Sequence, residues 1–173
     1  MKISAIVAMG KNRVIGKDNS MMWNIPSETE FYRSQVRGHF YIMGRRNFEG
    51  SMDKHNNEKV LILSSKNLDH YPQKSFYHLG EEINYAYSSG ERELFILGGG
   101  QVYENCLPYL THLYLSVVDF YKEGDVYFPD YTKQKWEEVF YFKKNMDDRT
   151  PLPWEFYLLK NLKPQDWKHL IDS

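Results

Sequence analysis

The chain has 173 residues, of which 42% are hydrophobic and 16% aromatic, and its formal net charge is -1. This length and composition are sufficient for one globular domain, and the near-neutral charge gives no general attraction for nucleic acid. The basic runs at 11–13 and 143–144 are too short to follow a phosphate backbone. The single cysteine, Cys106, excludes an internal disulfide and a thiolate metal cage, and it favours a reducing, cytoplasmic location.

No metal or membrane site is predicted. The histidines show no close pairing; they are His39, His55, His70, His78, His112 and His169. No apolar stretch is long enough to cross a membrane, and the apolar residues after Lys2 end at residues 11–13, too early for a signal peptide. We expect a monomer that binds neither nucleic acid nor a membrane.

Strands and helices alternate through the first two thirds of the chain. Apolar runs that end at glycine or polar residues predict strands at 3–8, 40–43, 60–63 and 93–97, with a weaker one at 76–78. Between them the sequence predicts helices at 27–36, with Ser27 as N-cap, around Phe48, around 83–86, and at 101–107.

Strands dominate the last third. Residues 111–118, 138–142 and 155–159 are rich in branched and aromatic side chains, and their alternation suggests antiparallel pairing. The predicted fold class is therefore α/β, an open and mostly parallel sheet with an antiparallel C-terminal edge and helices on both faces. The last residues, 164–173, predict a short helix with Trp167, Leu170 and Ile171 on one side.

Residues 21–28 (MMWNIPSE) form the most informative stretch of the chain. Helical spacing places Glu28, Phe31, Tyr32 and Gln35 on one side of the helix that follows. A carboxylate among aromatic rings is costly to ionise unless a donor meets it, so Glu28 is a candidate to bind a polar ring or to manage a proton. The alternative is that Glu28 complements the helix dipole on a wet surface.

Three strand ends favour an anionic ligand. Glycines 98–100 stand between a strand and a helix, where backbone N–H groups can approach a phosphate, although a tight turn would also explain them. Tyr103 occupies the place of the third glycine in the ordinary dinucleotide fingerprint. Residues 44–46 and 64–66 add guanidinium, hydroxyl and ammonium groups at two more strand ends. Because such ends meet at one edge of a sheet, they indicate a ligand with several phosphates, such as NADPH.

From residue 1 to about residue 160 the chain resembles the dihydrofolate reductase family. The matching motifs occur in order as IVAMGKNRVIG, MMWNIPSE, YIMGRRNFE, LILSS, ILGGGQVYE, LYLSVVD and EGDVYFPD. The resemblance implies one domain over residues 1–160, followed by a short extension over 161–173. It also implies hydride transfer from NADPH to the pterin ring of 7,8-dihydrofolate.

The resemblance also implies roles for individual residues. Glu28 matches the acid that orients the pterin and favours protonation of its imine nitrogen, Trp23 matches a tryptophan that holds an ordered water, and Ser116 matches a hydroxyl residue that supports the acid. Met21 and Met22 belong to a mobile loop over the nicotinamide. The implied substrate-binding residues are Ile6, Val7, Glu28, Tyr32, Arg33 and Ser116. The implied cofactor-binding residues are Ala8, Ile15, Gly44, Arg45, Arg46, Asn47, Ser64, Ser65, Lys66, Leu97, Gly98, Gly99, Gly100, Gln101, Val102 and Tyr103, with a cis peptide between Gly98 and Gly99.

The chain departs from the family pattern at the expected binding site for the folate tail. Glu58 stands where the family has an arginine that grips the α-carboxylate, and Arg33 or Lys59 are the candidate replacements. Loss of such a clamp should weaken tail binding by roughly 1.5–3 kcal/mol. Met22 and Asn47 replace a frequent proline and a frequent threonine. The alternatives are a reductase of a tail-less dihydropterin or related ring, and a non-catalytic nucleotide-binding homologue.

Overall fold

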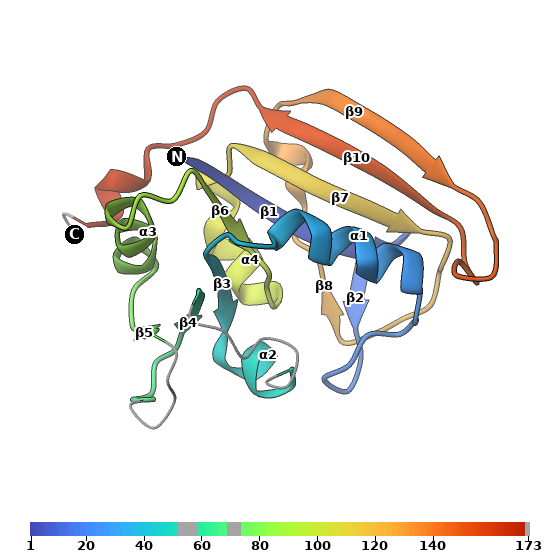
Figure 1. Ribbon diagram of the computed structural model, residues 1–173, viewed down its shortest axis with the longest axis horizontal. Helices are drawn as coiled ribbons and strands as arrows, with labels where there is room; N and C mark the ends of the chain where they lie inside the picture. The colour runs from blue at the N-terminus through green and yellow to red at the C-terminus, as the bar shows by residue number, and fades with distance from the viewer. Residues whose placement is uncertain (52–58, 69–73, 172–173) are drawn as a thin grey trace.

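A computed structural model describes residues 1–51, 59–68 and 74–171. In these residues eight strands form one sheet in the order β5-β4-β3-β6-β1-β7-β10-β9 (Figure 1). The strands are β1 (Lys2–Gly10), β3 (Tyr41–Gly44), β4 (Val60–Leu63), β5 (Lys74–Phe76), β6 (Glu93–Ile96), β7 (His112–Val118), β9 (Trp136–Lys144) and β10 (Trp154–Asn161).

The pairing pattern confirms the predicted fold class. From β5 to β7 every neighbouring pair is parallel, whereas β10 runs antiparallel to both β7 and β9. Parallel strands need long crossover connections, and the alternation of strands and helices in the first two thirds supplies them. The last two strands follow one another through a short connection, so they pair antiparallel.

A separate two-stranded ladder lies beside the main sheet. Strand β2 (Val14–Gly16) pairs antiparallel with β8 (Val126–Tyr127), which explains what the apolar residues after the first strand pack against. The chain just before β8 passes so close to β2 that it requires a glycine, because a Cβ added at Gly124 would overlap the Gly16 carbonyl and the Val14 side chain.

Helices cover both faces of the sheet. They are α1 (Pro26–Val36), α2 (Arg45–Glu49), α3 (Leu79–Ser88) and α4 (Gly100–Cys106), with 3-10 turns η1 (Leu107–Tyr109), η2 (Tyr131–Lys133) and η3 (Trp167–Leu170). Side chains of β1 alternate between the faces: Ala5 and Val7 join a core with residues of α3 and α4, whereas Ile6 joins a second core with Val36 of α1. Figure 1 shows α1 lying across β1 and β7.

The predicted N-cap of α1 is wrong. The helix begins at Pro26, Ile25 is its N-cap, and no side chain caps it. The hydroxyl of Ser27 instead lies 2.7 Å from the Thr150 hydroxyl and accepts a hydrogen bond from the Trp154 indole N–H at 3.1 Å. Because these partners come from the last third of the chain, they anchor the start of α1 to the antiparallel edge of the sheet.

The segment after β10 packs against α3. Leu170 lies so close to Gly80 that an added Cβ there would be 2.8 Å from it, and the rings of Trp167 and Tyr87 are 5.6 Å apart. The helical part is only the short turn η3, and Ile171 is 45% exposed, so the prediction that Ile171 shares the packed side is wrong.

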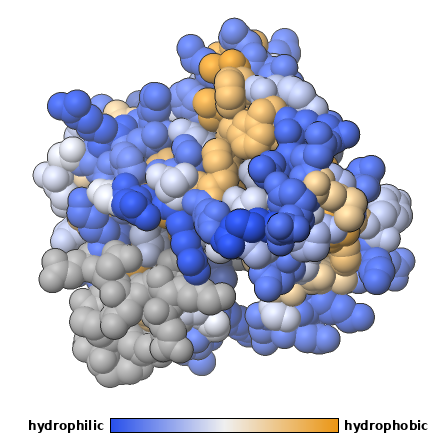
Figure 2. Space-filling view, turned by 45° about the vertical axis from the view of Figure 1, so that its right-hand side comes forward, coloured by the Kyte–Doolittle hydropathy of each residue, from blue (hydrophilic) through white to orange (hydrophobic). Residues whose placement is uncertain are grey.

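The surface is mostly hydrophilic on the face that Figure 2 shows, with apolar side chains gathered in bands between charged ones. Among the described residues, the exposed apolar side chains include Val139 and Phe140 of the edge strand β9. No helix in the described part of the chain has both the length and the apolar character needed to cross a membrane.

Candidate functional site

The site begins where β1 and β6 separate. These strands pair only from Lys2 with Glu93 to Ala5 with Ile96, while β1 continues to pair with β7 as far as Gly10. Beyond Ala5 the β6 side of β1 is therefore free of a strand, at the carboxyl ends of the parallel strands. Open α/β sheets bind their ligands at such places.

Glu28 faces this region from the first turn of α1. It is 7% exposed, and neither of its carboxylate oxygens forms a hydrogen bond with a described residue. Burial raises the pKa of Glu28 to about 7, because the charged form loses its water without gaining a donor. The alternative of an acid on a wet surface is therefore wrong.

Tyr103 connects Glu28 to the open part of β1. The Tyr103 hydroxyl donates a 2.7 Å hydrogen bond to the Ile6 carbonyl. Burial raises the pKa of Tyr103 well above its usual range, and the charges of Tyr32 and Glu28 raise it further. The carboxylate, the two phenols and the β1 backbone thus lie together.

Trp23 contributes an unsatisfied donor. Its indole N–H is buried and has no hydrogen-bond partner among the described residues, and its ring packs edge-on against Phe120 with 5.2 Å between centroids. Both Trp23 and Ala8 pack against the cluster that contains Ile25 and Val118. Leaving a buried donor unpaired costs about 1–3 kcal/mol, so this N–H is suited to a ligand or an ordered water.

Ser116 lies on the same sheet face as Ala8. It is 3% exposed, and its Cα pairs with Ala8 on β1 and with Phe156 on β10. Its hydroxyl forms no hydrogen bond with Glu28 in the described structure, so no direct bond supports the acid. Of the other predicted substrate-binding residues, Val7 is buried on the opposite face, with α3 and α4, and Arg33 is exposed on the last turn of α1.

The glycine turn after β6 is open toward the site. The Gly98-Gly99 peptide is cis, as expected, and Gly98 has a φ of +94°. A Cβ at Gly98 would lie 2.6 Å from the Tyr103 ring, whereas a Cβ at Gly99 would meet no atom within 4 Å. Gly98 therefore has to be glycine for its own packing, while Gly99 borders free space that a ligand could fill.

Hydrogen bonds join the ends of β3 and β6. The Gly44 N–H donates to the Gly98 carbonyl at 2.8 Å, and the Asn47 side-chain amide donates to the Leu97 carbonyl at 3.2 Å. Val102 is buried, and a Cβ added at Gly44 would approach its side chain to 3.1 Å. The predicted cofactor residues of these two strand ends are thus brought together.

Some of the polar groups predicted to bind phosphates are already engaged within the protein, and others are exposed and can reach a ligand. The Arg45 guanidinium pairs with Glu49 at 2.9 Å, and the Ser64 hydroxyl is used within its own turn, where it bonds both the N–H and the carbonyl of Lys66 at 3.0 Å. Arg46, Ser65 and the Lys66 side chain are exposed. Since Gly44 pairs with Leu63, these groups lie at the ends of neighbouring strands.

The residue range 2–161 matches the family model described as "Dihydrofolate reductase". The chain belongs to the dihydrofolate reductase family. It is 32% identical over 163 residues to the dihydrofolate reductase of Staphylococcus haemolyticus, covering 94% of this chain and 98% of the relative. The Bacillus subtilis (strain 168) dihydrofolate reductase is 31% identical over 157 residues, covering 90% of this chain and 92% of the relative.

A solved structure of the family has the same fold. It is the Enterococcus faecalis dihydrofolate reductase complexed with NADP(H) and RAB-propyl, with a TM-score of 0.79 and 22% sequence identity. The match covers 94% of this chain and 97% of the other.

For a dihydrofolate reductase, the loop of residues 123–127 contributes more than the sequence indicated. A Cβ at Gly100 would lie 3.0 Å from the Val126 side chain, and a Cβ at Gly124 would lie 3.1 Å from the Met22 sulfur. These residues, which include β8, therefore lie close to the start of α4 and to the segment that contains Met22. Gly124 was the signal that could have identified it. Two predicted cofactor-binding residues remain. Ile15 on β2 is half-buried, whereas Gln101 on α4 is exposed and its side-chain amide donates a hydrogen bond to the Asn105 side chain at 3.1 Å.

The expected tail-binding segment of the family lies largely outside the described residues, because only Lys59 of residues 54–59 is described. The Lys59 ammonium donates to the Gly38 carbonyl at 2.8 Å and lies 5.3 Å from the centre of the Phe40 ring. These contacts hold Lys59 at the end of α1, so Arg33 is the more available of the two candidate replacements.

Proposed function

We propose that the protein catalyses the NADPH-dependent reduction of 7,8-dihydrofolate to tetrahydrofolate. The observation that carries the proposal is Glu28, a buried carboxyl with a pKa of about 7 and no hydrogen-bond partner in the described part of the chain. A group in this state is suited to bind N–H donors of a flat heterocycle near neutral pH. Membership of the dihydrofolate reductase family supports the same assignment.

Glu28 would orient the substrate. Its two oxygens would accept hydrogen bonds from a ring nitrogen and the exocyclic amine of the pterin, replacing the water that burial removed. In this orientation the carboxylate favours the protonated imine, which makes the adjacent carbon a better acceptor of electrons. The unpaired indole N–H of Trp23 would hold a water close to the same ring.

Residues around the glycine turn fit NADPH. The space beside Gly99 would admit a pyrophosphate close to backbone N–H groups, and Ala8 would lie against the nicotinamide. Arg46, Ser65 and Lys66 would bind the outlying phosphate that distinguishes NADPH from NADH. When bound, NADPH supplies the hydride that reduces the pterin.

The alternative substrate is a dihydropterin without the glutamate tail. It is favoured because Lys59, a candidate to bind the tail carboxylate, already donates a hydrogen bond to the Gly38 carbonyl. Following NADPH absorbance with 7,8-dihydrofolate and with tail-less 7,8-dihydropterin separates the two. We expect a higher kcat/KM for dihydrofolate. A strong preference for the tail-less ring would replace the substrate assignment, and NADPH binding without oxidation by either would favour a non-catalytic homologue.

Arg33 provides a sharper test of tail recognition. We expect Arg33→Gln to raise KM for dihydrofolate by about tenfold, the scale of one charged hydrogen bond, and to leave KM for the tail-less ring unchanged. Arg37→Gln is the matched control, since Arg37 is exposed just beyond the end of α1. Equal effects of the two substitutions would remove Arg33 from the tail site.

We place the enzyme in the cytoplasm as a monomer, with no membrane or nucleic-acid partner. Cys106 is a free, buried thiol, and burial raises its pKa above the usual range, so it is protected from oxidation. Gel filtration at several protein concentrations tests the monomer, and elution as a stable dimer would contradict it.

A further inference from the structure

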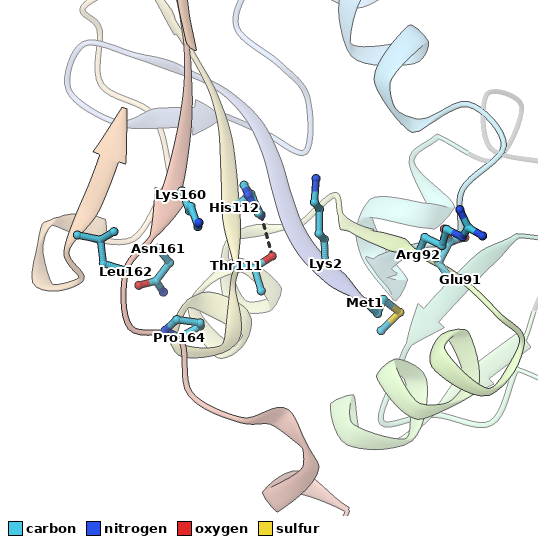
Figure 3. A pocket seen from close by; sticks show the side chains of 10 residues that line it. All are labelled: Met1, Lys2, Glu91, Arg92, Thr111, His112, Lys160, Asn161, Leu162 and Pro164. Atoms are coloured by element: carbon cyan, nitrogen blue, oxygen red, sulfur yellow. Dashed lines mark hydrogen bonds between the residues drawn. The ribbon is translucent and has the colours of Figure 1, made fainter. Parts of the chain in front are cut away.

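A second cleft lies at the opposite edge of the sheet from Glu28, beside the amino ends of β1 and β7. It has a volume of about 620 Å³, within the range of small-ligand sites. Figure 3 shows side chains from four strand ends and from the segment after β10 surrounding it. The lining residues are Met1, Lys2, Glu91, Arg92, Thr111, His112, Lys160, Asn161, Leu162 and Pro164.

Strand register gathers the basic side chains. Ser4 pairs with His112, and His112 pairs with Lys160, so these side chains project from the same face of the sheet. Lys2 is two residues before Ser4 on β1 and therefore points to that face as well. Burial and then the charge of Lys2 lower the pKa of His112, Glu93 acts in the opposite direction, and Lys160 lowers it again. The lysines are thus close enough to His112 for their charges to act on it.

The cationic groups are not neutralised by ion pairs. Among the described residues, Lys2, Arg92 and Lys160 have no carboxylate within 4.0 Å. The two nearest acids, Glu91 and Glu93, accept hydrogen bonds from other groups, which hold their carboxylates in place without removing their negative charge. Glu91 accepts from the Phe40 N–H at 2.7 Å and pairs with His39 at 2.9 Å.

The second nearby acid, Glu93, is also engaged. It accepts hydrogen bonds from the Ser4 hydroxyl at 2.8 Å and from the Tyr114 hydroxyl at 2.9 Å. Glu137 of β9 pairs in register with Lys160 without forming an ion pair, so among the described residues it is the acid placed to compete for that lysine.

The cleft wall is held in place by the segment after β10. The Asn161 side-chain amide donates to the Leu110 carbonyl at 2.8 Å, and the Gln165 N–H donates to the Pro108 carbonyl at 2.9 Å. These bonds fix Leu162 and Pro164 along one side of the cleft, opposite Arg92 (Figure 3). The cleft therefore has a wall on two sides, and its cationic side chains Lys2, Arg92 and Lys160 are exposed to solvent.

We propose that this cleft binds a small anion that carries two or more phosphate groups. Lys160 on β10 and Arg92 just before β6 supply positive charge at the two ends of the cleft, and Lys2 on β1 lies between them. Cations at both ends of a cleft suit separated phosphates better than a single one. A volume of about 620 Å³ is enough for a small molecule that carries several phosphates.

Isothermal titration of the protein saturated with NADPH tests the proposal, since the cofactor then protects its own phosphate-binding residues. The probes are inorganic tripolyphosphate, fructose 1,6-bisphosphate, orthophosphate and a long RNA oligonucleotide. We expect at least one of the first two to bind, orthophosphate to bind more weakly, and added salt to weaken binding. Tighter binding of tripolyphosphate would identify the ligand class as a phosphate chain, and tighter binding of fructose 1,6-bisphosphate would identify it as an organic bisphosphate.

Substitutions locate the binding. We expect Lys2→Gln and Lys160→Gln each to weaken binding about five- to tenfold, the range for a partly exposed charged contact. Glu137→Gln should tighten binding, because it removes the competing acid. Lys143→Gln, an exposed lysine at the other end of the edge hairpin, is the matched control and should have no effect. Melting temperatures within experimental error of wild type exclude misfolding as the cause of any loss.

Three results would overturn the proposal: no binding of either multiphosphate probe at millimolar concentration, binding that Lys2→Gln and Lys160→Gln leave intact, or binding only of a long RNA oligonucleotide.

Discussion

The pKa of Glu28 makes a quantitative prediction about stability. The carboxyl has a pKa of about 7 in the folded protein, against 4.5 for an ordinary glutamate, and its only cause is burial. Between these values the folded state holds a proton that the unfolded state has released. The stability associated with this proton is fully present below about pH 4.5 and is lost as the pH rises to about 7.

The magnitude follows from the same two values. From about pH 5 to about pH 8, Glu28 should lower the free energy of unfolding by about 2.5 kcal/mol. Glu28→Gln is neutral throughout, so the variant should gain that amount relative to wild type over the same interval. Any change in packing is the same at both pH values and cancels.

Urea unfolding of the ligand-free proteins, followed by tryptophan fluorescence at both pH values, measures the difference. Glu104→Gln, which removes an exposed acid on α4, is the control and should leave the pH dependence of wild type unchanged. If Glu28→Gln and wild type lose stability in parallel as the pH rises, Glu28 is not a desolvated acid and the reasoning fails.

Two further predictions concern the cofactor side. Gly98→Ala should lower stability by about 1–3 kcal/mol, because its φ is +94° and its Cβ would meet the Tyr103 ring, whereas Gly99→Ala should fold normally and weaken NADPH binding. Thermal melts and NADPH titrations distinguish them, and equal melting temperatures would refute the packing argument. Arg46→Gln and Lys66→Gln should each raise the Kd for NADPH about tenfold and leave that for NADH nearly unchanged. A similar loss for both cofactors would place these residues away from the outlying phosphate.

The sequence predicted the sheet because its signals are local. Each buried strand of the parallel part is a short apolar run closed by glycine or polar residues, and β10 alternates between buried and half-buried residues from Trp154 to Tyr157. The glycine turn was also predictable, since three consecutive glycines at a strand end are hard to explain by packing alone.

The features that sequence reasoning missed depend on distant partners. Ser27 looked like an N-cap because of its position before Glu28, but Trp154 and Thr150, more than 120 residues away, take its hydroxyl. Glu82 of α3 gave no signal of burial, yet it is fully buried, no described residue donates a hydrogen bond to either of its oxygens, and burial raises its pKa well above the usual range. Such effects arise only when separate elements pack together.

The basic cleft was missed for the same reason. Lys2, His112 and Lys160 are isolated in sequence, and each is explained as a solvated side chain when considered alone. Only the order β1-β7-β10 places them side by side. The position of Glu28, in contrast, was predicted from helical spacing, although its lack of a donor required the structure.

The central claim is that Glu28 orients and activates the pterin, and steady-state turnover of Glu28→Gln with 7,8-dihydrofolate across the pH range tests it most directly. The account predicts a loss in kcat of about 100-fold or more at neutral pH, partial recovery in acid as the substrate arrives protonated, and a Kd for NADPH close to wild type. Neutral-pH turnover equal to that of wild type would contradict it.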